Sequence, residues 1–173
     1  MSRTLTFARK LISLKNRVLV TDETGEQLYE ATWAFGFPTR TWEISNSGGV
    51  VASFRRRLFS LPAKWDVDTP SGAYVLRKPW FSFVRRIRVM GGVFSGVEMV
   101  SGPFKMIYKI SKGSKLLARA DTKILTIRDR HDLVIEDDTP GVELLCVILV
   151  VNLMTQKFSA SSAESSRSST SDD

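Results

Sequence analysis

The stretch GVELLCVILVVNLM, Gly141 to Met154, decides the fold, because it is apolar on every side and suits either a membrane anchor or a buried core helix. A membrane-spanning helix needs about 20 predominantly apolar residues. The run from Val142 to Met154 would form only about 20 Å of helix. Glu143 and Asn152 would also sit at or inside the hydrocarbon boundary. The sequence therefore predicts no transmembrane span and a helix enclosed by protein.

The residues around this run are typical of a helix in a globular protein. Asp137, Asp138 and Thr139 are candidate caps, and Pro140 suits a first helical turn. Polar residues follow Met154, which places the predicted helix at about residues 140–156. Glu143 and Asn152 lie about 180° apart around a helix, so no polar stripe faces solvent. Such a helix needs apolar partners on all sides.

Short β-hairpins recur through the rest of the chain. Each unit has apolar residues spaced by two, then polar turn-forming residues and a glycine, then a second β-type run. Three units align by their glycines: VLVTDETG (Val18–Gly25), WEISNSGG (Trp42–Gly49) and WDVDTPSG (Trp65–Gly72). Two more follow: YKISKGSKLLAR (Tyr108–Arg119), and ILTIRDRHDLVI (Ile124–Ile135) with a charged turn. The pattern predicts a mainly β protein.

Alternation of apolar and polar residues indicates that one face of these strands is buried and the other is wet. An antiparallel meander of this kind must close to hide its apolar face and its edges. We therefore expect a closed antiparallel β-barrel around the C-terminal helix. One domain would cover residues 1–158, and the serine-rich segment 159–173 has the composition of a disordered tail.

Composition limits the possible chemistry. A single cysteine, Cys146, rules out an internal disulfide and favours a cytoplasmic location, and no export signal is visible. One histidine, His131, and one cysteine are too few for a common zinc site, and no cofactor motif is present. We interpret His131 as an exposed residue in the turn DRHD and Cys146 as an inert core residue. Neither an enzymatic nucleophile nor a phosphate-loop motif is recognisable, which disfavours an enzyme.

Several of these segments resemble the LURP-one-related family: the hairpins built on VLVTDETG and WDV, the basic residues after the second hairpin, and IEDDTPGVELLCVILVVNLM. The resemblance covers about Leu5 to Phe158. That family is similar in fold to phospholipid scramblases and to the tubby C-terminal domain. The resemblance implies a barrel of about twelve strands around a central hydrophobic helix, with no established enzymatic activity. It also implies membrane association, since tubby-like proteins bind phosphoinositides through basic side chains. No lipid-binding position matches residue by residue, and no cysteine-rich palmitoylation segment is present.

The chain carries a net charge of +7, and its last residues are net acidic, so the positive charge concentrates in the predicted barrel. The densest basic segments are SFRRRLFSL and LRKPWFSFVRRIRV, in which Trp80 would share a strand face with Arg86 and Arg88. Such groups suit the phosphates of anionic lipid head groups at a membrane. The candidate residues are Arg55, Arg56, Arg57, Arg77, Lys78, Arg85, Arg86 and Arg88.

Three other interpretations compete with lipid binding. The same cations could simply solvate the outside of a barrel. Nucleic acid would also attract them, but the alternation turns most aromatic side chains inward and leaves few surfaces for base stacking. A scaffold that presents loops to an unknown protein partner is the main functional alternative. The preferred hypothesis is peripheral binding of anionic phospholipid or phosphoinositide head groups by a non-enzymatic domain.

Overall fold

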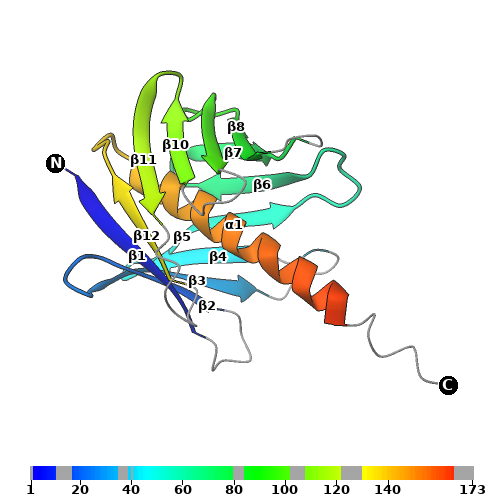
Figure 1. Cartoon of the computed structure of the whole chain (residues 1–173), viewed down its shortest axis with the longest axis horizontal. Coiled ribbons are helices and arrows are strands. Elements are labelled where there is room, and N and C mark those ends of the chain that lie inside the picture. Colours follow the sequence, from blue (N-terminus) through cyan, green and yellow to red (C-terminus); the bar gives the residue numbers. More distant parts are fainter. Residues whose placement is uncertain are drawn as a thin grey trace.

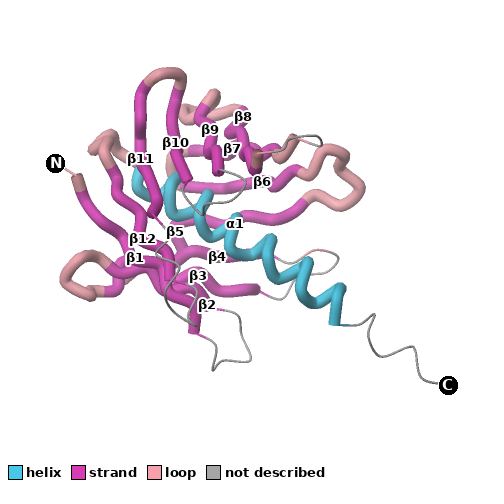
Figure 2. Tube along the Cα trace, in the orientation of Figure 1, coloured by secondary structure: helices cyan, strands magenta, loops and turns pink. Residues whose placement is uncertain are grey.

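The computed structural model describes residues 2–10, 17–34, 39, 41–79, 84–101, 108–121 and 130–165. Within these residues, twelve strands precede one helix (Figures 1 and 2). The elements are β1 (Arg3–Lys10), β2 (Arg17–Thr21), β3 (Gln27–Ala34), β4 (Thr41–Asn46), β5 (Gly49–Arg56), β6 (Lys64–Thr69), β7 (Gly72–Arg77), β8 (Arg85–Met90), β9 (Val97–Ser101), β10 (Tyr108–Lys112), β11 (Lys115–Asp121), β12 (Arg130–Ile135) and α1 (Val142–Ser165).

The strands form a closed antiparallel barrel. Each strand pairs with its neighbours in sequence, and β1 pairs with β12 from Arg3↔Ile135 to Ala8↔Arg130. Closure leaves no unpaired sheet edge, which removes the main route to edge-to-edge aggregation. The predicted closed barrel of about twelve strands is confirmed.

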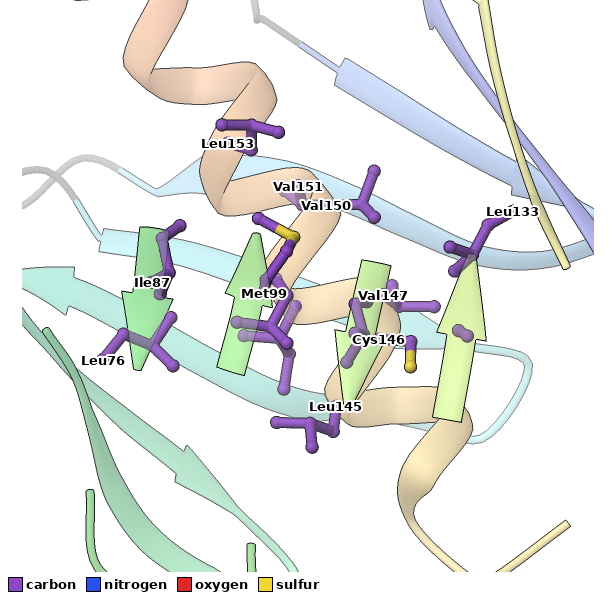
Figure 3. Packing of buried hydrophobic residues seen from close by; sticks show 14 of the residues in the cluster. Leu76, Ile87, Met99, Leu133, Leu145, Cys146, Val147, Val150, Val151 and Leu153 are labelled. Atoms are coloured by element: carbon purple, nitrogen blue, oxygen red, sulfur yellow. The ribbon is translucent and has the colours of Figure 1, made fainter. Parts of the chain in front are cut away.

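The first part of helix α1 lies inside this barrel, as predicted, and its last turns extend beyond the strands (Figure 2). Its residues from Leu145 to Val151 are all at most 1% exposed. Strand residues such as Leu76, Ile87 and Leu133 pack around them, as Figure 3 shows. The barrel wall supplies the apolar partners that a helix without a polar stripe requires. Within the described part of the chain, no helix is long and apolar enough to cross a membrane.

The helix begins slightly later and ends later than the predicted 140–156. It continues to Ser165, so the last turns overlap the segment 159–173 that was predicted to be a tail. Residues 166–173 lie outside the described part of the chain. Side chains are described only as far as Gln156, where the apolar sequence has already given way to polar residues.

Side chains from several elements hold the start of α1. Glu143 accepts hydrogen bonds from Arg3 and from the Tyr29 hydroxyl, both at 2.8 Å. Asp137 pairs with Lys115 at 2.7 Å and accepts hydrogen bonds from the Thr139 amide (3.1 Å) and hydroxyl (2.7 Å). The hydrogen bond from Lys115, followed by that from Thr139, lowers the pKa of Asp137 to about 2. Asp137 thus stabilises the turn that precedes the helix through its contacts with Thr139 and Lys115.

The prediction that His131 lies in an exposed turn is wrong. His131 belongs to β12, is 3% exposed and has its ring 6.1 Å from the ring of Tyr108. The charged neighbour Asp132 is turned to the opposite face, where it accepts a 2.8 Å hydrogen bond from Thr6. Pairing with β1 extends from Ile135 back to Arg130, so the strand already includes the charged residues. The earlier half of the predicted hairpin, residues 124–129, lies outside the described residues.

The two ends of the barrel differ. At the turn end, short turns join β2 to β3, β4 to β5, β6 to β7 and β10 to β11, and α1 begins. At the loop end, β5 and β7 finish, β6 and β8 begin, and α1 leaves the barrel (Figure 1). Acidic residues gather at the turn end: Asp22, Glu23, Glu26, Glu136, Asp137 and Asp138.

Candidate anion-binding surface

The eight predicted basic residues come from neighbouring strands and meet at the loop end. Arg55 and Arg56 end β5, Arg57 follows directly, and Arg77 ends β7 with Lys78 next to it. Arg85, Arg86 and Arg88 lie in β8, which pairs with β7. Pairing of β5 with β6 and of β6 with β7 completes a continuous surface. The side chain of Arg85 lies outside the described part, as does Trp80, so the proposed aromatic partner stays a prediction.

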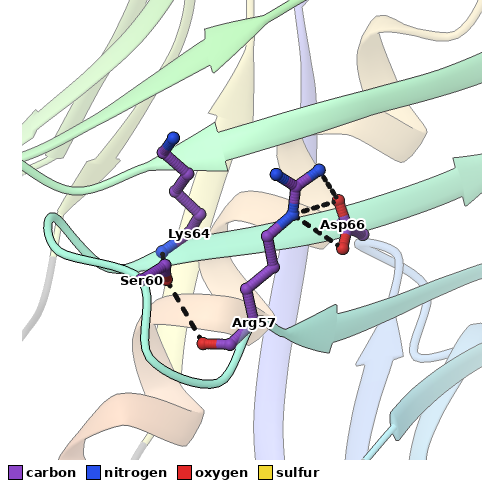
Figure 4. Close-up of polar contacts among 4 residues, drawn as sticks. All are labelled: Arg57, Ser60, Lys64 and Asp66. Carbon is purple, nitrogen blue, oxygen red and sulfur yellow. Dashed lines mark hydrogen bonds and ion pairs between the residues drawn. The ribbon is translucent and has the colours of Figure 1, made fainter.

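Arg57 is already occupied by a carboxylate. Its Nε lies 2.8 and 2.9 Å from the two oxygens of Asp66, and one terminal nitrogen lies 2.6 Å from Oδ1 (Figure 4). The hydrogen bonds from Arg57 lower the pKa of Asp66 below its ordinary value. This two-pronged contact is the strong geometry of an arginine–carboxylate pair. Arg57 therefore joins the start of the β5–β6 loop to β6, and its hydrogen-bond donors are less available to a ligand.

Glu98 of β9 partly neutralises the cations of β8. Its carboxylate lies 2.6 Å from Nε of Arg88 and 3.8 Å from Nε of Arg86. Arg88 remains half exposed, at 50% of its side chain. One carboxylate thus serves two guanidinium groups, which leaves a net positive charge at this edge of the surface.

Arg55, Arg56 and Arg77 take part in no described ion pair, although Arg55 stands directly opposite Asp66, whose pKa is lowered first by Arg57 and also by Arg55. All three are exposed, and no described carboxylate lies within ion-pair distance of them. Arg55 points outward on β5 beside Asp66, the residue that already binds Arg57. These three side chains keep their hydrogen-bond donors available to an incoming anion.

Lys64, Arg77 and Arg88 form a cation row, which sequence reasoning missed. Lys64 stands directly opposite Arg77, and Arg77 stands directly opposite Arg88. The buried neighbours Trp65, Leu76 and Ile87 show that all three cations are on the outer face. Like charges placed directly opposite each other on a sheet are destabilising. The alternation in KWDVDT could have placed Lys64 outside, but only the register reveals the row.

The C-terminal part of α1 is tied to this surface. The Lys78 amine donates to Gln156 Oε1 at 3.2 Å, and the Gln156 amide donates to Asn152 Oδ1 at 2.7 Å. Asn152 is fully buried inside the barrel. A polar chain therefore runs from the barrel interior to the basic surface and fixes where the helix emerges.

Outside the basic surface, the described residues include one buried thiol and one polar groove. No group of three or more described His, Cys, Asp or Glu residues could hold a metal ion. Burial raises the pKa of the Cys146 thiol to about 12, so this thiol stays protonated at neutral pH. A shallow polar groove lies between β1 and the β2–β3 turn, lined by Thr4, Thr6, Asp22, Glu23 and Asp132 among others. Its carboxylates make it a poor site for an anion.

Comparison with known proteins gives one result that bears on the whole domain. The family model described as LURP-one-related matches residues 3–154, which includes every strand and the buried part of α1. A comparison with curated proteins returns no match. Since the family model covers most of the chain, the chain belongs to the LURP-one-related family.

Proposed function

We propose that this protein is a non-enzymatic domain that binds the anionic head groups of phospholipids or phosphoinositides at a membrane surface. The supporting observation is the cation row, where Lys64, Arg77 and Arg88 stand side by side; of the two carboxylates nearby, Glu98 pairs with Arg88 and Asp66 is held by Arg57. A phosphate placed over this row would relieve the repulsion among the three cations. The proposed site combines the row with Arg55 and Arg56.

The arrangement suits a surface better than a small soluble ligand. The cations come from β5, β6, β7 and β8: Arg55, Lys64, Arg77 and Arg88 are on the outer face of the barrel, and Arg56 is exposed at the loop end on the side of Phe54 and Trp65. A basic residue near an anionic membrane contributes about 1 kcal/mol to binding. Five such residues would give useful affinity at low salt. The protein would bind peripherally to the cytoplasmic leaflet of a membrane, without spanning it.

Vesicle co-sedimentation tests the proposal. The protein is mixed with phosphatidylcholine vesicles that contain phosphatidylserine, phosphatidylinositol bisphosphate or neither, at low and high salt. We expect binding to both anionic vesicles at low salt and release at high salt, because salt screens exposed charges beyond roughly 10 Å at 0.1 M. Absence of binding to both anionic vesicles at low salt would refute the proposal and favour a protein-interaction scaffold.

Matched variants locate the site. Arg55→Gln with Arg77→Gln removes two unpaired cations and should weaken binding about 30-fold, since each contributes about 1 kcal/mol. Lys109→Gln with Lys112→Gln removes the same charge from exposed positions on β10 and should have a much smaller effect. Equal losses in the two double variants would mean that only net charge matters and that the surface of β5 to β8 is not the site.

A further inference from the structure

The loop between β5 and β6 exposes an unusual amount of apolar surface. Phe59 is 100% exposed, Leu61 is 74% exposed and Leu58 is 48% exposed. The described residues include seven exposed large apolar side chains, so three of the seven lie on this one short loop. A contiguous exposed apolar patch on a small protein commonly marks a contact with a partner or a membrane. We call Leu58, Phe59 and Leu61 the apolar tip.

Hydrogen bonds at the base of the loop support the conformation in which the apolar tip is exposed. The Ser60 hydroxyl donates to the Arg57 carbonyl at 3.2 Å and accepts from the Lys64 amide at 3.1 Å (Figure 4). The Arg57 amide donates to the Lys64 carbonyl, and the Lys78 amide donates to the Ala63 carbonyl, both at 2.9 Å. The pair of Arg57 with Asp66 adds a further contact at the base of the loop.

Phe59 also has an unfavourable backbone conformation. Its φ of +56° places a bulky aromatic residue in the left-handed region, which glycine and asparagine occupy more readily. Folding alone gives no reason to place phenylalanine here, since its ring has no neighbours to pack against. A contact with a partner outside the chain would explain why Phe59 has a strained backbone and a fully solvent-exposed ring.

The surroundings of the tip indicate what that contact is. The unpaired cations Arg55 and Arg56 immediately precede the loop, and Arg77 lies on the strand beside it. Three apolar side chains can bury no more than about 600 Å², which is below the roughly 800 Å² per partner of a standard protein interface. An anionic bilayer requires no such area, because shallow insertion and charge attraction act together. Charge complementarity therefore favours a membrane.

We propose that the apolar tip inserts into the boundary between head groups and acyl chains of an anionic bilayer, while Arg55, Arg56 and Arg77 bind the phosphates around it. This inference rests on the proposed function and adds an orientation to it. The loop end of the barrel faces the membrane. The acidic turn end, with Asp22, Glu23 and Glu136, faces away from the negative lipid surface.

A fluorescent label reports insertion directly. In Phe59→Cys the introduced thiol is exposed, whereas Cys146 is buried with a raised pKa and stays unlabelled in the folded protein. An environment-sensitive dye at residue 59 should shift to the blue with phosphatidylserine vesicles and be quenched by a lipid that carries a quencher on its acyl chain. Val93→Cys, in an exposed turn at the other end of the barrel, is the control and should show neither change.

An affinity measurement with an unlabelled variant completes the test. Phe59→Asn removes the ring but tolerates the positive φ, so folding is preserved. Its binding to phosphatidylserine vesicles should be about tenfold weaker than wild type, while Val93→Asn should bind like wild type. Soluble inositol trisphosphate should bind wild type and Phe59→Asn equally, because it meets only the cations.

The two proposals fail in different ways. If wild type does not bind anionic vesicles, the proposed function is refuted. If wild type binds and both the label at residue 59 stays in water and Phe59→Asn binds like wild type, head-group binding stands and insertion is refuted. An acyl-chain quenching signal from Phe59→Cys together with weakened binding of Phe59→Asn supports insertion.

Discussion

Replacement of Asn152 by leucine should make this protein more stable. Asn152 is fully buried in α1, and only its oxygen is used, by the Gln156 amide at 2.7 Å. Its Nδ2 has no hydrogen-bond partner among the described residues. A buried donor without a partner costs about 1–3 kcal/mol. Leucine has the same branched outline, removes that cost and meets the apolar lining of the barrel.

The hydrogen bond that Asn152→Leu loses offsets only part of the gain in stability. Asn152→Leu breaks the hydrogen bond to Gln156, and such a bond contributes about 1 kcal/mol on average. Gln156 is only half-buried and keeps its contact with Lys78, so its amide can turn to water. The free energy of unfolding should therefore rise by up to about 2 kcal/mol. A methyl group is slightly larger than an amide nitrogen, which limits the gain.

Urea unfolding followed by circular dichroism measures this change. With a urea m-value of about 2 kcal/mol/M, the midpoint should move upward by up to about 1 M while m stays constant. Asn152→Asp has the same outline but adds a charge inside the barrel, and it should destabilise the fold by several kcal/mol. A lower midpoint for Asn152→Leu would refute the reasoning, because it would mean that the amide is satisfied in the folded protein.

Three further predictions concern the fold. Gly141→Ala should lower the free energy of unfolding by about 2 kcal/mol or more in thermal unfolding, because Gly141 has a φ of +84° and an added Cβ would lie 2.9 Å from Cζ of Phe94. The control Gly113→Ala, at a φ of +58° with no atom within 4 Å of the added Cβ, should cost less. Equal losses in the two variants would contradict this account. Ile148→Lys places an unpaired charge among fully buried residues and should prevent folding, so a soluble variant with native β circular dichroism would show that the helix is not enclosed. The pKa of Asp66 in the folded protein lies below its ordinary value of 3.8. The contribution of Asp66 to stability is therefore fully present above pH 3.8 and is lost as the pH falls through the pKa of the folded state. Asp66→Asn should remove this part of the acid sensitivity in urea unfolding, and an unchanged pH dependence would show that the pair with Arg57 contributes nothing.

Local patterns in the sequence predicted most of the fold. The recurring apolar pairs before polar turns located β2 with β3, β4 with β5, and β6 with β7, because hairpins depend on short-range periodicity and turn chemistry. The length and all-round apolarity of residues 142–154 identified a helix that needs enclosure. Closure followed from the lack of any other partner for that helix. The hairpins and the helix depend on neighbours in the sequence and could be read directly, whereas closure, which joins β1 to β12, was inferred only from the helix's need for enclosure.

Features that depend on pairing register could not be predicted. The row of Lys64, Arg77 and Arg88 exists because three strands align at those residues, and a shift of one position would separate the charges. The contact between Arg57 and Asp66 also crosses strands. His131 was misassigned because a run of charged residues indicates a turn, although charges also fit the wet face of a strand.

The pairing of the first strand with the last has a consequence for biosynthesis. Since β1 hydrogen-bonds to β12 and α1 follows β12, the ribosome must release almost the whole domain before the ring can shut around its own final segment. Until then the apolar inner face of the sheet is exposed in the nascent chain, where chaperones can bind it or where it can cause aggregation. Premature termination anywhere before the helix should therefore leave an insoluble fragment, not a smaller functional protein.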